Sequence, residues 1–222
     1  MDSVSKKAEI VEAFIQKVES SSLRNVHVAK LIMQLGINRN TFYYHFDSKY
    51  DVALLVFRYD LAGELKKAFS EDELVCAPVG TRKSTEILPF YAHREGGART
   101  LDQGEFFKAL VRCILSRPVF YGSLFDSTQT EFRACIETLY RPAIQDDLRF
   151  MLGGRYLPDS VFDFFADYYT RYIFQIAEYY AKHTRAASDM LDERVNPFWN
   201  MAHESLLQEL QTHPVQRPRN SR

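Results

Sequence analysis

Apolar side chains recur at helical intervals along most of the chain. The first series consists of Ala8, Val11, Ile15 and Val18. Their spacing of three and four residues places them on one side of a helix, which is predicted over residues 5–20. Charged and polar residues lie mostly on the opposite side. The helix is therefore expected to pack on a core by one face.

Two short helices are predicted next, over residues 26–34 and 38–46. Gly36 follows the apolar positions of the first one, and glycine adopts the left-handed conformation of a helix C-cap at little cost. Asn38 is a good N-cap for the second one. The pair is thus predicted to be joined by a tight turn.

A fourth helix is predicted over residues 49–74, with Ser48 as its N-cap. The composition then changes. Residues 76–104 contain four of the nine glycines and two of the eight prolines. This stretch is predicted to be irregular, with one short helix over residues 85–93.

Helical periodicity returns after residue 104 and continues almost to the end of the chain. Further helices are predicted over residues 105–116, 119–151 with an interruption at Pro142, 159–182 and 197–210. The pattern predicts an all-α fold. A three-helix helix-turn-helix domain is expected over residues 1–48, a helical bundle for regulation and dimerisation over residues 49–212, and a flexible tail over residues 213–222.

The composition excludes several classes of protein. The 222 residues are 46% hydrophobic and 26% charged, as in globular domains. The chain lacks a run of about 18 apolar residues and a secretory signal, so a cytoplasmic location without a membrane partner is expected. The three cysteines are too far apart for a zinc site and too few for a disulfide framework.

Charge is distributed unevenly along a chain whose net charge is −1. Residues 1–50 contain seven lysines and arginines against five acidic residues, whereas residues 51–222 contain 21 against 24. The small positive excess lies at the N-terminal end. This is the sign expected if that end faces phosphate.

Residues 26–49 have the spacing of a helix-turn-helix motif, VHVAKLIMQLGINRNTFYYHFDSK. The first helix needs an apolar face, which Leu31 and Leu35 supply, and Gly36 allows the bend. The second helix must present polar side chains near its start, and it opens with Arg39 and Asn40. These features predict a DNA-binding segment.

The same segment resembles the DNA-binding domain of the TetR (tetracycline-repressor-like) family. The resemblance rests on the Gly36-Ile37 turn, the sequence Thr41-Phe42-Tyr43-Tyr44-His45-Phe46, and Lys49. It spans about residues 8–60, a quarter of the chain. The remainder is similar to the family only in being helical and of suitable length.

The resemblance implies a role for each position of the motif. Arg39, Asn40 and Tyr44 stand where the family's recognition helix meets base edges, and their side chains suit that task. The positions that would meet phosphates are Thr41, Tyr43, His45, Lys49 and His27. Phe42 and Phe46 are expected to point inward. His27 departs from the usual threonine or serine and Asn40 from a small residue, which leaves the base specificity open.

The region after residue 50 holds 25 of the 31 aromatic residues. In TetR-like proteins such a region binds an effector, and the last two long helices build a homodimer on a palindromic operator. The resemblance therefore implies a ligand-responsive repressor, although an activator fits equally. The expected wall residues for a small apolar or aromatic effector are Phe107, Leu110, Phe125, Phe165 and Tyr169, with Gln103, Arg112, Gln129 and Gln175 as polar candidates.

Three alternatives compete with this interpretation of the C-terminal region. The aromatics could simply fill a helical core. The region could bind a protein partner in place of a small molecule, through residues 76–104. Catalysis is disfavoured, because the six histidines have no zinc-type spacing and no nucleophile elbow, phosphate loop or dinucleotide fingerprint occurs. Neither a metal nor a cofactor is expected.

Overall fold

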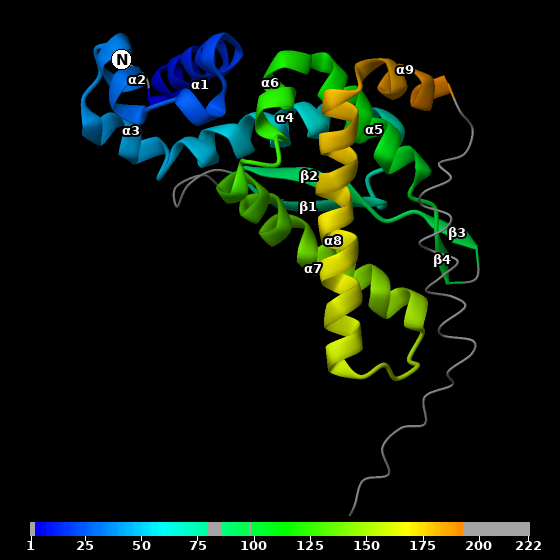
Figure 1. The fold of residues 1–222 in the computed structure, drawn as a ribbon. Coiled ribbons are helices and arrows are strands. Elements are labelled where there is room, and N and C mark those ends of the chain that lie inside the picture. Colours follow the sequence, from blue (N-terminus) through cyan, green and yellow to red (C-terminus); the bar gives the residue numbers. More distant parts are fainter. Residues whose placement is uncertain (1–2, 80–85, 98, 193–222) are drawn as a thin grey trace, which may run out of the picture.

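The computed structural model describes residues 3–79, 86–97 and 99–192, and helices dominate it (Figure 1). The α-helices are α1 (Ser3–Ser21), α2 (Val28–Leu35), α3 (Arg39–His45), α4 (Lys49–Ala68), α5 (Gly104–Ser116), α6 (Pro118–Leu124), α7 (Thr130–Leu152), α8 (Asp159–Lys182) and α9 (Thr184–Asp192). A 3-10 turn, η1 (Leu23–Asn25), joins α1 to α2. The predicted helical fold class is confirmed, with short strands as a minor addition.

The first three helices gather at one end of the molecule, and α4 runs from them into the remainder (Figure 1). Gly36 ends α2 with φ 60°, in the left-handed region. Asn38 caps α3 by accepting a hydrogen bond from the Asn40 amide. Ser48 and Asp51 form a capping box at the start of α4. The caps expected from the sequence at positions 36, 38 and 48 are confirmed.

We call residues 3–48 the head and residues 49–192 the body. The interior of the head is built mainly from Phe14, Leu23, Leu31, Phe42 and Phe46, and it is continuous with the apolar core of the body. Of the predicted apolar face of α1, Ile15 and Val18 are buried, Val11 is half-buried and Ala8 is exposed. The helix also buries Ile10 and Phe14, which the predicted series did not include. The short helices α2 and α3 are stable only because they bury side chains in the same interior, since helices of this length are marginal by themselves.

The body is built around α4, α5, α7 and α8, with α4 packed on α5 and α7 on α8. Aromatic rings meet edge to face in its centre. Phe125 contacts Phe57, Phe132 and Phe174, with ring centroids 5.4–5.6 Å apart. Such contacts stabilise a core beyond the area that they bury.

The stretch predicted to be irregular with a short helix forms strands. β1 (Leu74–Pro78) and β2 (Ile87–Ala92) pair antiparallel, and β3 (Glu95–Gly97) pairs with β4 (Thr100–Leu101). The prediction of a helix over residues 85–93 is wrong. The sequence of β2, Ile-Leu-Pro-Phe-Tyr-Ala, is buried from its second residue on, and its contacts with α4 outweigh any local preference for helix.

Three other boundaries differ from the sequence prediction. α4 ends at Ala68, before a turn in which Glu73 accepts hydrogen bonds from the amide and hydroxyl of Ser70. α7 continues through Pro142. The break lies earlier, between α6 and α7, where Asp126 accepts from the amide and hydroxyl of Thr128. The predicted helix over residues 197–210 and the tail over residues 213–222 lie outside the described residues.

Candidate nucleic-acid interface

One face of α3 is turned outward and the other is buried. Arg39, Asn40, Tyr43 and Tyr44 are exposed. Phe42, by contrast, is fully buried and packs against the ring of Phe46, with the ring centroids 5.8 Å apart. The helix is therefore fixed to the head by its aromatic face and presents a polar and phenolic face to solvent.

The exposed face of α3 is preorganised by contacts among its own side chains. The guanidinium carbon of Arg39 lies 5.3 Å from the ring centroid of Tyr43. The same ring meets the edge of Phe42 at 5.4 Å. Arg39 is thus held beside an anchored ring, which lowers the conformational entropy that it would lose on binding a base edge.

Thr41, His45 and His27 flank this face. Thr41 and His45 are half-buried, and His27 is exposed at the N-cap of α2, where its side chain makes no capping hydrogen bond. Burial lowers the pKa of His45, and the positive charge of Lys7 lowers it further. The imidazole is consequently neutral at physiological pH and could give one hydrogen bond to a phosphate without adding charge.

Lys49 has a different task in this structure from the phosphate contact that the resemblance implies. Its ammonium group donates to the carbonyl oxygens of Leu23, Arg24 and Val26, at 2.8, 3.4 and 3.1 Å. An ammonium has three hydrogens, and these carbonyls engage all of them. Burial also lowers the pKa of Lys49. The side chain therefore ties η1 and the residue after it to the start of α4.

Helix α6 connects the head to the body in addition to α4 itself, and Phe14 of α1 packs edge to face against Phe120 of α6. The amide of Leu23 in η1 donates to the hydroxyl of Ser123 in α6 at 2.6 Å. In turn, Arg117 and Tyr121 of α6 both donate to a carboxylate oxygen of Asp60 in α4, at 3.1 and 2.7 Å. A change in the spacing of α4 and α6 would therefore reach the head through both helices.

The five residues expected to line an effector pocket lie in or against the apolar core of the body. Phe107, Leu110 and Phe125 are completely buried in the closed core, Tyr169 is buried, and Phe165 is half-buried against it. None of them lines the main cavity of the described chain. Sequence spacing indicates that a residue is buried, but it does not show whether that residue packs in a filled core or lines a cavity.

The polar residues proposed for orienting an effector are also dispersed. Gln103 is buried and donates to Asp147 at 3.2 Å, and Arg112 pairs with Glu64 at 3.2 Å. Gln129 is buried and Gln175 exposed. None of the four lines the main cavity.

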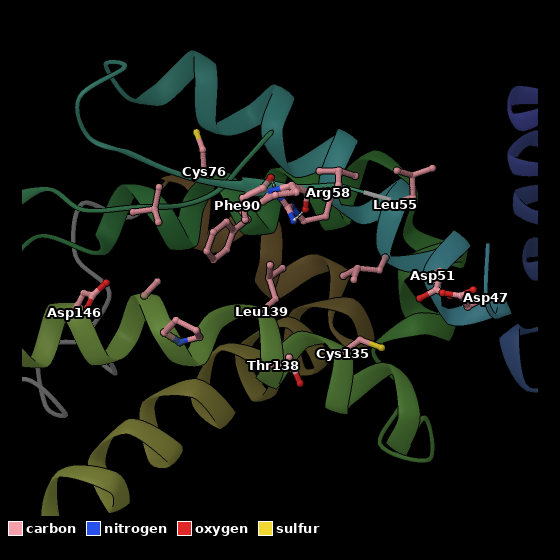
Figure 2. Close-up of a pocket in the computed structure, with 17 residues that line it drawn as sticks. Asp47, Asp51, Leu55, Arg58, Cys76, Phe90, Cys135, Thr138, Leu139 and Asp146 are labelled. Carbon is pink, nitrogen blue, oxygen red and sulfur yellow. Dashed lines mark hydrogen bonds between the residues drawn. The ribbon is translucent and has the colours of Figure 1, made fainter. Parts of the chain in front are cut away.

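A cavity lies between α4, the β1–β2 hairpin and α7 (Figure 2). It is an open groove of about 540 Å³, a size typical of small-molecule sites. Phe90, Leu55 and Leu139 contribute apolar wall, and Arg58 contributes a guanidinium. The sequence analysis missed this groove because one wall is the hairpin that it did not predict.

The outer face of α8 carries exposed aromatic rings. Phe164 is 63% exposed, and Tyr168 and Tyr179 are about half exposed. Phe164 and Tyr168 stack with ring centroids 6.3 Å apart and an angle of 19°. These outward rings are exposed to solvent in the single chain.

Among the described residues, no group of histidine, cysteine or acidic side chains could hold a metal ion. The same part of the chain contains no helix that is both long and apolar enough to cross a membrane.

Comparison with solved structures gives a distant structural likeness. The structure of the dihydroxyacetone kinase operon activator DhaS aligns with 96% of this chain and 99% of its own, with 13% sequence identity and a TM-score of 0.47. No protein-family model matches the sequence. No curated protein matches it either. The likeness is too distant to assign a family or a function.

Proposed function

We propose that this protein is a sequence-specific DNA-binding transcription regulator that acts as a homodimer and responds to an effector in its body. The observation that carries the proposal is the two-sided α3 helix. Its aromatic residues Phe42 and Phe46 are sealed into the head, while Arg39, Asn40 and Tyr44 project outward from a helix that follows a tight turn. This is the arrangement of a recognition helix in a major groove.

The chemistry of the outward face supports base reading. Arginine forks onto the N7 and O6 atoms of guanine, and asparagine pairs with adenine in the same two-pronged way. The phenolic hydroxyls of Tyr43 and Tyr44 suit phosphate oxygens or base edges. His45 can donate a ring N–H to a phosphate oxygen of the DNA backbone.

The exposed rings of α8 support the dimer. Phe164 and Tyr168 form an exposed stacked pair of rings, which a helix of a second copy would cover. A second copy would place two head units side by side, so that two recognition helices meet half-sites about one helical turn apart, ~34–36 Å. The effector would shift the equilibrium between two separations of the heads. The repressor direction is the one that the TetR resemblance implies.

The alternative is that the body binds a protein partner in place of a small molecule. We expect such a partner to dock on the stretch 76–104, which includes the β1–β2 hairpin. A stoichiometric protein partner that binds the wild-type chain, together with no thermal shift by small molecules, would favour this alternative.

Arg39→Ala tests the proposed recognition face. On duplexes selected from a random pool, we expect the preference at one base pair to relax, at a cost of about 1–3 kcal/mol for the best sequence and little for non-specific DNA. Lys66→Ala, which removes one exposed positive charge near the far end of α4, serves as the matched control. Unchanged affinity and preference in Arg39→Ala would refute the assignment of α3.

A further inference from the structure

Arg58 is an unusual residue in the middle of the groove wall. It lies on α4 and is only 2% exposed. One terminal nitrogen, Nη2, donates to the carbonyl oxygens of Ala77 and Leu88, at 2.9 and 2.7 Å, and Nη1 lies 3.4 Å from the carbonyl of Pro78. The buried Nε has no hydrogen-bond partner. The guanidinium thus holds both strands of the hairpin and retains unused donor capacity.

The charge of Arg58 is not neutralised within the described part of the chain. Other arginines of the body pair with carboxylates, including Arg94 with Glu73 and Arg112 with Glu64. Arg58 instead meets carbonyl dipoles and lies 5.1 Å from the ring centroid of Phe90. A buried positive charge without a counterion raises the free energy of the folded chain. An anion that binds beside it would lower that free energy.

The acidic side chains that line the groove do not supply this counterion. Figure 2 shows Asp47 and Asp51 at one end of the groove and Asp146 at the other, with Arg58 between them. Asp51 accepts hydrogen bonds from Ser48 in the capping box, and Asp146 pairs with Arg149 at 2.7 Å. The middle of the groove therefore combines one cation with apolar walls.

We propose that the groove binds an organic monocarboxylate, with its carboxylate against Arg58 and its apolar body along Phe90, Leu55 and Leu139. This deepens the proposed function, because it names the chemical class of the effector. A monocarboxylate fits better than a phosphate ester for two reasons. The guanidinium has few donors left to offer, and the acids at both ends of the groove repel a second negative charge.

The position of Arg58 explains how such a ligand would be sensed. Arg58 joins α4 to both strands of the hairpin, and α4 begins at the capping box beside the recognition helix. A carboxylate would compete with the hairpin carbonyls for the guanidinium hydrogens. The hairpin and α4 would then shift relative to each other, and α4 leads directly to the head.

The test compares each acid with its uncharged amide on the full-length wild-type protein, by calorimetric titration without DNA. The probes are hexanoate, decanoate and benzoate, each matched with the corresponding primary amide. We expect at least one acid to bind about tenfold or more tightly than its amide, as for a charge-assisted hydrogen bond at a buried site. If no acid binds more tightly than its amide, the proposal is overturned.

Two variants locate the site. Arg58→Gln should abolish the preference for acid over amide, while Arg112→Gln, which alters an arginine outside the groove, should retain it. Leu139→Trp should fill the groove and weaken the binding of acid and amide alike, while Arg58 itself is not substituted. A preference that survives in Arg58→Gln, or affinity that survives in Leu139→Trp, contradicts the proposal. Because no DNA is present, these results are independent of whether the head binds DNA.

Discussion

The head and the body differ in where they keep their polar groups. In the described chain, the buried polar or charged residues are Arg58, Gln103, Gln129, Asp147 and Thr170, all of which belong to the body. The interior of the head is entirely apolar by the same measure. The head places its hydrogen-bonding groups on the surface of α3, whereas the body encloses several of its own.

This difference indicates two kinds of task. Burying a polar group destabilises a protein unless the group is hydrogen-bonded. A core that only has to pack would therefore be apolar, and the polar groups inside the body indicate a further role. In the body, Asp147 accepts hydrogen bonds from Tyr91 at 2.6 Å and Gln103 at 3.2 Å and lies 2.8 Å from Nδ1 of His93. This network joins α7 to β2, which together flank the groove. The head needs only a rigid apolar support for its outer face.

The largest effect is expected from removing that support. Phe42→Ala deletes a ring that is fully buried in the head, and we expect it to lower the free energy of unfolding by about 3–5 kcal/mol and to abolish DNA binding. Tyr43→Ala is the matched control on the exposed face, expected to lower the free energy of unfolding by about 1 kcal/mol or less, because it removes only the contacts of a half-exposed ring with Phe42 and Arg39. Urea unfolding at fixed protein concentration measures both. Comparable losses in the two variants would contradict the two-sided description of α3.

A smaller effect is expected at Lys49, where a substitution distinguishes a structural role from a contact with DNA. Lys49→Met removes three hydrogen bonds to η1 and its following residue but keeps most of the stem. We expect a loss of about 1–2 kcal/mol in the free energy of unfolding and no change in how DNA affinity depends on salt. Lys30→Met, at an exposed position of α2, is the control for stability. A salt slope lower by about one unit would show that Lys49 reaches a phosphate after all.

The smallest effect concerns the pH dependence of the body. The hydrogen bond to Asp147 raises the pKa of His93 above its ordinary 6.5, although burial opposes it. A raised pKa in the folded state stabilises the protein below about pH 6.5, and this contribution is lost as the pH rises through the folded-state value. The free energy of unfolding should therefore fall as the pH rises above about 6.5.

The contribution of His93 is expected to be below about 1 kcal/mol, because the side chain is partly exposed and screened. Burial raises the pKa of Asp147 as well, which gives a slope of the same sign at lower pH. His93→Gln should flatten the decline above pH 6.5, while His27→Gln in the head should leave it unchanged. An equally steep decline in His93→Gln would rule out this ion pair as its cause.

The sequence predicted the head well because local signals decide its structure. Gly36, Asn38 and Ser48 act through their own backbone conformation or through hydrogen bonds to residues two or three positions away. The apolar spacing of α1 and α3 also points to a single face. Lys49 is the exception. Its carbonyl partners lie 23–26 residues away in the sequence, and no local pattern predicts them.

The body was less predictable because distant contacts override local preference there. The strand β2 forms from a segment predicted as helix, since β1 and α4 bury it. Pro142 is tolerated inside α7, where a local rule predicts a break. Arg58 gave no signal in the sequence, because one arginine among helical residues is ordinarily solvated. Arg58 is a buried cation in the wall of a groove only because the β1–β2 hairpin folds over it.

The most direct test of the central claim is selection of bound sequences from a random duplex pool by the full-length protein, at two salt concentrations. The account predicts enrichment of an inverted repeat whose half-sites lie about one helical turn apart, ~34–36 Å, with weaker binding at the higher salt. A folded, dimeric protein that enriches no sequence at either salt concentration would contradict the assignment of the head as a DNA-reading unit.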